Sequence, residues 1–169
     1  MTVTDLALLL LFPCMMAYAA CSDLLSMRIS NKVSLLVIAA FVPMAIAMGL
    51  GWQDWLMHVA AGGLTLVIAF GLFAAGWIGG GDAKLAAATA LWLGWGTLLE
   101  YAVVSSVFGG VLTLALLQLR AVPLPGFANW PWLMRLHHHK TGIPYGIALA
   151  AGALAVYPHS TIWNAAIGA

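Results

Sequence analysis

Long apolar runs, separated by short polar or glycine-containing stretches, make up most of the chain. A helix needs about 20 apolar residues to cross the hydrocarbon core of a bilayer, and fewer where neighbouring helices shield it. Runs of this kind cover residues 6–21, 33–50, 55–77, 85–99, 101–119 and 143–157. The pattern therefore predicts an all-α, polytopic membrane bundle of about six transmembrane helices.

The composition indicates one membrane-embedded unit. Of 169 residues, 64% are hydrophobic and 7% are charged, and the mean hydropathy is +1.03. Six basic and five acidic side chains cannot cover such a core with a polar shell in water. We expect residues 1–169 to form a single domain within the lipid bilayer, with no separate soluble domain. The net charge of +1 argues against nucleic-acid binding, which needs a clustered basic surface.

The basic residues fall only in alternate connections between the apolar runs. They are Arg28, Lys32, Lys84, Arg120, Arg135 and Lys140. The acidic residues Asp5, Asp54 and Glu100 lie near the opposite ends of the runs. Because positive charge accumulates on the cytoplasmic side of membrane proteins, we expect the basic connections in the cytoplasm and both termini on the opposite side of the membrane.

The connection 120–141 and the two cysteines are given structural interpretations and no chemical role. The connection 120–141 is rich in Pro and Trp and is expected to lie along the cytoplasmic interface. Its consecutive histidines 137–139 are interpreted as a solvated tract, because three successive residues of a regular helix cannot face one metal ion. Cys14 and Cys21, both in the first run, are expected to be small buried side chains.

Two acidic residues, Asp23 and Asp82, lie on the basic side of the membrane in this topology. Asp23 ends the first run, and Asp82 precedes the fourth, so both are expected at the same membrane depth. A carboxylate retained at a helix end in an apolar bundle is costly and is therefore a hypothesis of function. We expect the two to act together.

Three glycines, at positions 79–81, precede Asp82. Residues without a side chain allow a sharp turn and the close approach of another backbone, such as that of a peptide substrate. Taken alone, the glycines are also consistent with a plain turn between helices, and Asp82 with an N-cap of the next helix.

The order of these residues resembles a known signature. Gly79-x-Gly81-Asp82-x-Lys84, with Asp23 upstream and followed by Ile29-x-Asn31, resembles the motifs of the bacterial prepilin peptidases, the G-x-G-D aspartic membrane proteases.

A third segment, Pro144-Tyr145-Gly146, is similar to the Pro-Tyr-Gly segment that precedes the last helix of that family. The resemblance extends over nearly the whole chain, with the motifs in the same order.

The resemblance implies that Asp23 and Asp82 are the two catalytic aspartates. Supporting or substrate-binding roles are then implied for the matching motif residues, which are Gly79, Gly81, Lys84, Asn31, Pro144, Tyr145 and Gly146. The expected partner is a prepilin with a basic leader and an apolar stem. The expected location is the bacterial inner membrane, with periplasmic termini.

The long members of the family carry a cytoplasmic segment with paired C-x-x-C motifs and methylate the new amino terminus. Such motifs are absent from this sequence, which therefore resembles the short, peptidase-only branch of Flp, or tight-adherence, pilus systems. We expect no methyltransferase activity. Paired carboxylates hydrolyse peptides with one ionised and one protonated member, so no metal or organic cofactor is expected.

Two functions of other classes remain open on the sequence. Intramembrane carboxylates also relay protons or cations in transporters and channel subunits, although those proteins more often place charges at the bilayer midplane. A membrane-embedded assembly scaffold without chemistry is the other alternative, and it leaves the pairing of Asp23 with Asp82 to coincidence.

Overall fold

The computed structural model describes residues 2–124 and 130–168. Within this part of the chain every regular element is helical: α1 (Val3–Ser26), α2 (Asn31–Ala47), α3 (Trp52–Ala74), α4 (Gly80–Leu93), α5 (Leu98–Ala121), α6 (Pro131–His137), α7 (Tyr145–Val156), the 3₁₀ turn η1 (Tyr157–His159) and α8 (Thr161–Ile167). The predicted all-α membrane bundle is confirmed.

The helices do not form six spans of equal length. Among the described residues, α1, α3 and α5 are long and apolar enough to cross a membrane, and α2 is a shorter apolar helix. The runs predicted at 85–99 and 143–157 correspond to α4 and α7, which have only 14 and 12 residues. Because α4 packs against α2, α3 and α7, protein rather than lipid surrounds much of it, and a full span is not required.

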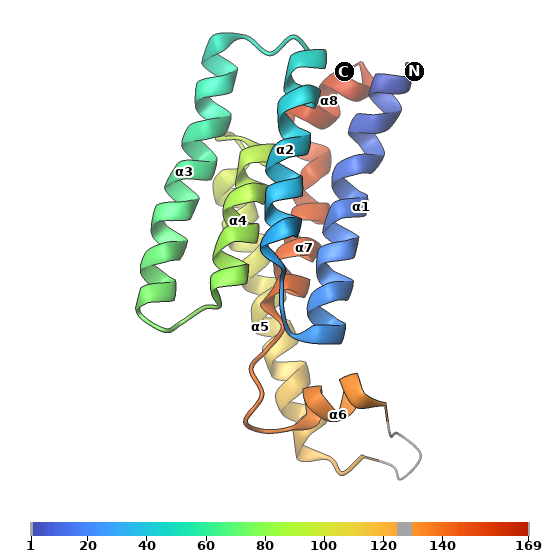
Figure 1. Ribbon diagram of the computed structural model, residues 1–169, viewed down its shortest axis with the longest axis vertical. Helices are drawn as coiled ribbons and strands as arrows, with labels where there is room; N and C mark the ends of the chain where they lie inside the picture. The colour runs from blue at the N-terminus through green and yellow to red at the C-terminus, as the bar shows by residue number, and fades with distance from the viewer. Residues whose placement is uncertain (1, 125–129, 169) are drawn as a thin grey trace.

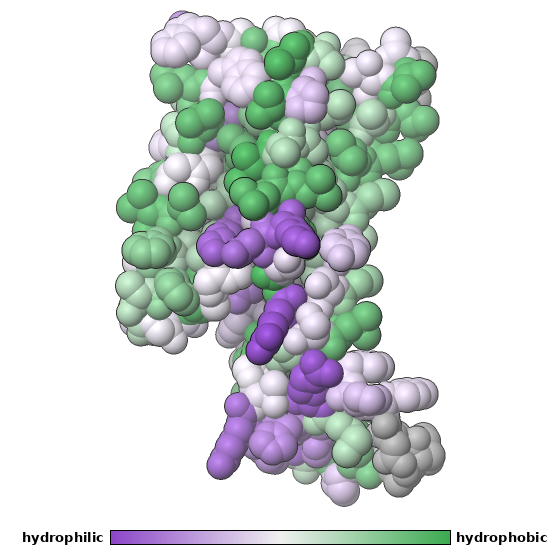
Figure 2. Space-filling model, viewed as in Figure 1, coloured by the Kyte–Doolittle hydropathy of each residue, from purple (hydrophilic) through white to green (hydrophobic). Residues whose placement is uncertain are grey.

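The helices run alternately up and down, so that both termini lie at one end of the bundle (Figure 1). The connections after α1, α3 and α5 lie toward the other end, where α5 and α6 extend beyond the remaining helices. Figure 2 shows hydrophilic side chains gathered on this lower half and a mostly apolar upper half.

An aromatic core holds the helices together on the side of the termini. The Phe12 ring stacks on Trp92 with 5.2 Å between centroids and lies 4.6 Å from the Tyr157 ring. The indole of Trp92 donates a 2.7 Å hydrogen bond to the carbonyl of Val37. The Tyr157 hydroxyl donates one of 2.6 Å to the carbonyl of Leu8. Buried tyrosine and tryptophan donors are thus satisfied, and α1, α2, α4 and η1 are joined.

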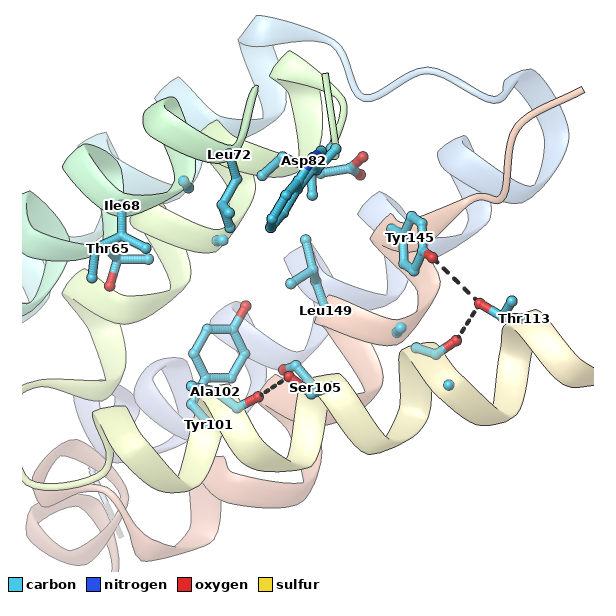
Figure 3. A pocket seen from close by; sticks show the side chains of 18 of the residues that line it. Thr65, Ile68, Leu72, Asp82, Tyr101, Ala102, Ser105, Thr113, Tyr145 and Leu149 are labelled. Atoms are coloured by element: carbon cyan, nitrogen blue, oxygen red, sulfur yellow. Dashed lines mark hydrogen bonds between the residues drawn. The ribbon is translucent and has the colours of Figure 1, made fainter. Parts of the chain in front are cut away.

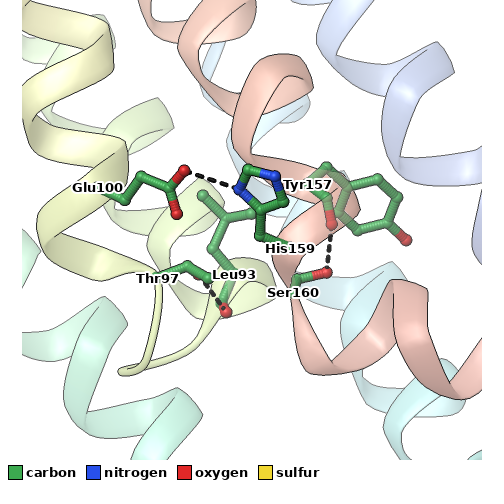
Figure 4. Close-up of polar contacts among 6 residues, drawn as sticks. All are labelled: Leu93, Thr97, Glu100, Tyr157, His159 and Ser160. Carbon is green, nitrogen blue, oxygen red and sulfur yellow. Dashed lines mark hydrogen bonds and ion pairs between the residues drawn. The ribbon is translucent and has the colours of Figure 1, made fainter. Parts of the chain in front are cut away.

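Polar contacts fix the turns at the same end (Figure 4). Thr97 donates to the carbonyl of Leu93, and Ser160 to that of Tyr157. His159 lies 2.7 Å from the Glu100 carboxylate, so the first turn of α5 meets η1.

The cysteine prediction was wrong. Cys14 and Cys21 are both exposed on α1, on the face that the bundle leaves uncovered. Their seven-residue spacing places them on one helix face, and in an apolar chain a sequence pattern does not distinguish a lipid-facing side chain from a buried one.

Candidate active site

Asp23 lies in the last turn of α1, with only 4% of its surface exposed. Its Oδ2 accepts a 2.8 Å hydrogen bond from the backbone N–H of Gly146, in the first turn of α7. The first N–H groups of a helix have no partner within it and carry partial positive charge. The start of α7 therefore orients the carboxylate and stabilises its negative charge.

Gly146 has no room for a side chain. A Cβ there would lie 2.8 Å from Asp23 Oδ2 and 2.6 Å from Ile29 Cδ1. Pro144, which is buried, stands at the N-cap of α7, where its fixed φ is compatible with starting a helix. The Pro-Tyr-Gly segment predicted from the sequence thus reaches the first aspartate.

Asp82 lies in the first turn of α4 and is half-buried. Its Oδ2 accepts a 3.2 Å hydrogen bond from the backbone N–H of Gly79. The N-cap itself is Gly79, so Asp82 occupies the third helical position, from which its side chain caps the start of α4. This bond uses one lone pair of the carboxylate, whose other lone pairs can accept hydrogen bonds from another partner.

Gly81 allows a second close approach. A Cβ at this position would lie 3.1 Å from the carbonyl oxygen of Ile29 and 3.2 Å from its Cβ. The connection between α1 and α2 therefore packs directly on the start of α4, and Ile29 lies between Gly81 and Gly146. This packing brings the segments of the two aspartates together.

The two aspartates line one cavity of about 550 Å³, with the end of α1, the α1–α2 connection and the three glycines. Ser22 and Ser26 stand in the same wall. Asp23 and Asp82 therefore lie in the same cavity, as expected from the sequence, although they are 59 residues apart in the chain.

The remaining predicted residues surround this cavity in different ways. Lys84 is exposed and donates a 2.9 Å hydrogen bond to Oδ1 of Asn31, which joins the starts of α4 and α2. In the described part of the chain, no cation forms an ion pair with either aspartate. The role of Lys84 and Asn31 is therefore more consistent with positioning than with charge neutralisation.

Tyr145 faces a second cavity. A Cβ added at Gly109 of α5 would lie 3.4 Å from the Tyr145 ring. The Tyr145 hydroxyl is 3.4 Å from the Thr113 hydroxyl, also on α5. This cavity is a mostly apolar groove of about 720 Å³ with walls from α3 and α5 and with residues of α4 and α7 between them. Asp82 lines both cavities, and Figure 3 shows it at one end of the groove.

The sequence analysis did not predict that the arginine at the end of α5 is buried. Arg120, at the end of α5, donates from Nε to the carbonyl of Leu136 at 2.7 Å and from a terminal nitrogen to that of Gly142 at 2.9 Å. From the sequence, Arg120 is only one of six basic residues expected on the cytoplasmic side. Its fork-shaped donor group fastens α6 and the segment before Pro144 to α5.

The predicted interfacial connection lies partly outside the described residues, because 125–129 belong to it. Of the histidines, His137 has Nε2 at 2.8 Å from the carbonyl of Val122. In the described ranges, no three His, Cys, Asp or Glu side chains gather as metal ligands would.

An apolar helical bundle in which two carboxylates line one cavity is typical of a membrane protein with a candidate hydrolytic centre. The model of the type IV leader peptidase family matches residues 10–114, which is more than half of the chain. The protein belongs to this family and is a multi-pass membrane peptidase. The match includes Asp23 and the Gly79–Lys84 segment, whereas Pro144, Tyr145 and Gly146 lie beyond it. Neither a curated protein nor a solved structure matches the chain.

Proposed function

We propose that this protein is an aspartic endopeptidase that removes the leader of prepilins at the cytoplasmic face of the bacterial inner membrane, with Asp23 and Asp82 as the catalytic pair. The observation that carries the proposal is the shared cavity of these two carboxylates. Each has one oxygen held by a backbone N–H at the start of a helix, which orients it without using its full capacity.

The absence of ion-pair partners among the described residues supports a catalytic role. Carboxylates kept for structure are usually paired with a cation when they are removed from water. Asp23 is almost fully buried, yet its only hydrogen-bond donor in the described chain is the Gly146 N–H. A buried acid without a counter-charge is a common feature of functional sites.

The mechanism follows from two neighbouring carboxylates. Because like charges repel in a partly desolvated site, the pair retains one proton between its members. The ionised member takes a proton from water as that water attacks the scissile carbonyl carbon. The protonated member donates to the carbonyl oxygen. The first carboxyl then passes the proton that it took from water to the leaving nitrogen. As the C–N bond breaks, a hydroxyl of the tetrahedral intermediate returns its proton to the second carboxylate, so the pair again holds one proton.

The substrate we propose has a basic leader that stays in the cytoplasm and an apolar stem in the bilayer. Its scissile bond then lies at the interface, at the level of the aspartates. The basic residues of the protein lie on or next to the connections at this same end of the bundle. By the positive-inside rule this supports a site at the cytoplasmic face and both termini in the periplasm. We further propose that the natural substrate is a Flp-type pilin and that the protein does not methylate its product.

A proton- or cation-conducting function is the second candidate. It would use the same carboxylates, but it requires a polar path to the other end of the bundle. There, Phe12, Trp92 and Tyr157 fill the core, so the geometry favours the peptidase.

The test is to purify the protein, place it in liposomes and add a prepilin-like peptide with a lysine-rich leader, one glycine at its end and an apolar stem. Mass spectrometry should find a single cut after the glycine. Cleavage at scattered bonds, or none, would contradict the proposed substrate.

A further inference from the structure

Ile29, in the connection between α1 and α2, lies between the two helix starts that hold the candidate catalytic carboxylates. Its Cβ and its carbonyl oxygen would be 3.2 and 3.1 Å from a Cβ at Gly81, the residue before Asp82. Its Cδ1 would be 2.6 Å from a Cβ at Gly146, whose N–H binds Asp23. The isoleucine therefore reaches from the start of α4 to the start of α7.

The same side chain forms part of the wall of the peptidase cavity. Of the described residues that line this cavity, Met27 and Ile29 are the two with apolar side chains. Ile29 is 9% exposed, and it supplies the atoms nearest to a Cβ at Gly81 and at Gly146, whereas Met27 supplies none of them. A peptide bond within reach of both carboxylates therefore lies next to Ile29.

Hydrogen bonds hold the backbone on both sides of Ile29. Ser22 and Ser26 donate to the carbonyl of Arg28 at 3.3 and 3.1 Å. On the other side, the hydroxyl of Ser30 caps the start of α2. Because isoleucine is branched at Cβ, few of its rotamers are accessible. Ile29 therefore presents a fixed wall to the substrate.

We propose that Ile29 is a specificity-determining residue, which restricts the substrate residue whose carbonyl is attacked to glycine. This inference rests on the proposed function, in which the leader ends in a glycine. A residue without a side chain allows the closest approach of the substrate backbone to the wall between the carboxylates. A methyl group at that position would compete with Ile29 for the same space, and one carbon in an apolar pocket changes specificity by about 10-fold to 200-fold.

The experiment compares two prepilin-like peptides in liposomes, which differ only in having glycine or alanine before the scissile bond. The parent protein should prefer the glycine peptide by at least about tenfold in kcat/KM. Ile29→Val, which removes only Cδ1, should reduce this preference about threefold, and Ile29→Ala should reduce it to about twofold or less. Because the two peptides are compared in the same variant, a general loss of activity does not change the ratio.

Peptide affinity in the Asp82→Asn protein provides a second measurement, which does not depend on turnover. The glycine peptide should bind more tightly than the alanine peptide, and adding Ile29→Ala should remove the difference. Met27→Ala is the matched control, because it shortens the other apolar side chain of the cavity, and it should keep the preference for glycine.

Three results would overturn the role of Ile29. They are a parent protein that cleaves both peptides equally well, a preference that survives Ile29→Ala, and an equal loss of preference in Met27→Ala. Failure of the proposed function is seen separately, because the parent protein would then cleave neither peptide.

Discussion

The backbone N–H of Gly146 and the carboxylate of Asp23 are joined by a 2.8 Å hydrogen bond across 123 residues of sequence. The contact ties the last turn of α1 to the first turn of α7, and a Cβ at Gly146 would be 2.8 Å from the carboxylate oxygen it now serves. The position of the candidate catalytic acid therefore depends on a glycine near the other end of the chain.

Gly146→Ala should lower the rate of leader cleavage by about tenfold or more, because the added methyl displaces Asp23 and Ile29 and a misplacement of about 1 Å can cost about 100-fold. The measurement is the initial cleavage rate of the prepilin-like peptide in liposomes. Gly63→Ala is the control, because nothing lies within 4 Å of a Cβ there. Equal rates for Gly146→Ala and Gly63→Ala would contradict the role of this contact.

Lys84 and Asn31 should act as one unit. Lys84→Met and Asn31→Ala each remove the same exposed 2.9 Å hydrogen bond, and exposed charged contacts contribute about 1 kcal/mol or less. Each change should lower the cleavage rate by less than tenfold. The double variant should cleave no more slowly than the slower of the two single variants. Additive losses would mean that at least one of these side chains has a separate task, such as contact with substrate.

Arg120→Met should loosen the segment before α7. The substitution removes two donors and leaves the carbonyls of Leu136 and Gly142 without them, each at a cost of about 1–3 kcal/mol. Hydrogen exchange of residues 138–144 should become faster, with a smaller fall in cleavage rate. Arg135→Met, at an exposed position, is the control, and unchanged exchange in Arg120→Met would show that the two bonds do not hold this segment.

The cleavage rate should pass through a maximum as pH is varied. At low pH both carboxylates are protonated and no base remains to activate water. At high pH both are ionised and no acid remains to polarise the carbonyl. The limbs report the pair and not either residue alone. A rate that rises monotonically across the range in which the protein stays folded would argue against a shared proton.

The orientation can be tested with single cysteines in a protein whose Cys14 and Cys21 have been replaced. Ser30→Cys, in the connection after α1, should be protected from an impermeant thiol reagent applied from the periplasmic side. Gln53→Cys, at the start of α3, should react. The reverse pattern would place Asp23 and Asp82 on the side away from a cytoplasmic leader.

The sequence allowed the helical membrane class and the pair of aspartates to be predicted, because lipid forces long apolar runs and makes an isolated acid conspicuous. It did not predict the shortness of α4 and α7, because hydropathy does not reveal whether protein or lipid surrounds a run. It also gave no sign that Arg120 is buried and donates to the carbonyls of Leu136 and Gly142. That property depends on which segments become neighbours in the fold.

The central claim is that Asp23 and Asp82 together hydrolyse the leader peptide. The most direct measurement is the cleavage rate of one prepilin-like peptide by the parent protein and by Asp23→Asn, Asp82→Asn and Asp54→Asn in the same liposomes. The amide keeps the shape of the side chain but removes the titratable group, so Asp23→Asn and Asp82→Asn should each lose at least about 100-fold, whereas Asp54→Asn, remote from the cavity, should cleave normally. Cleavage at the parent rate by either of the first two variants would contradict the claim.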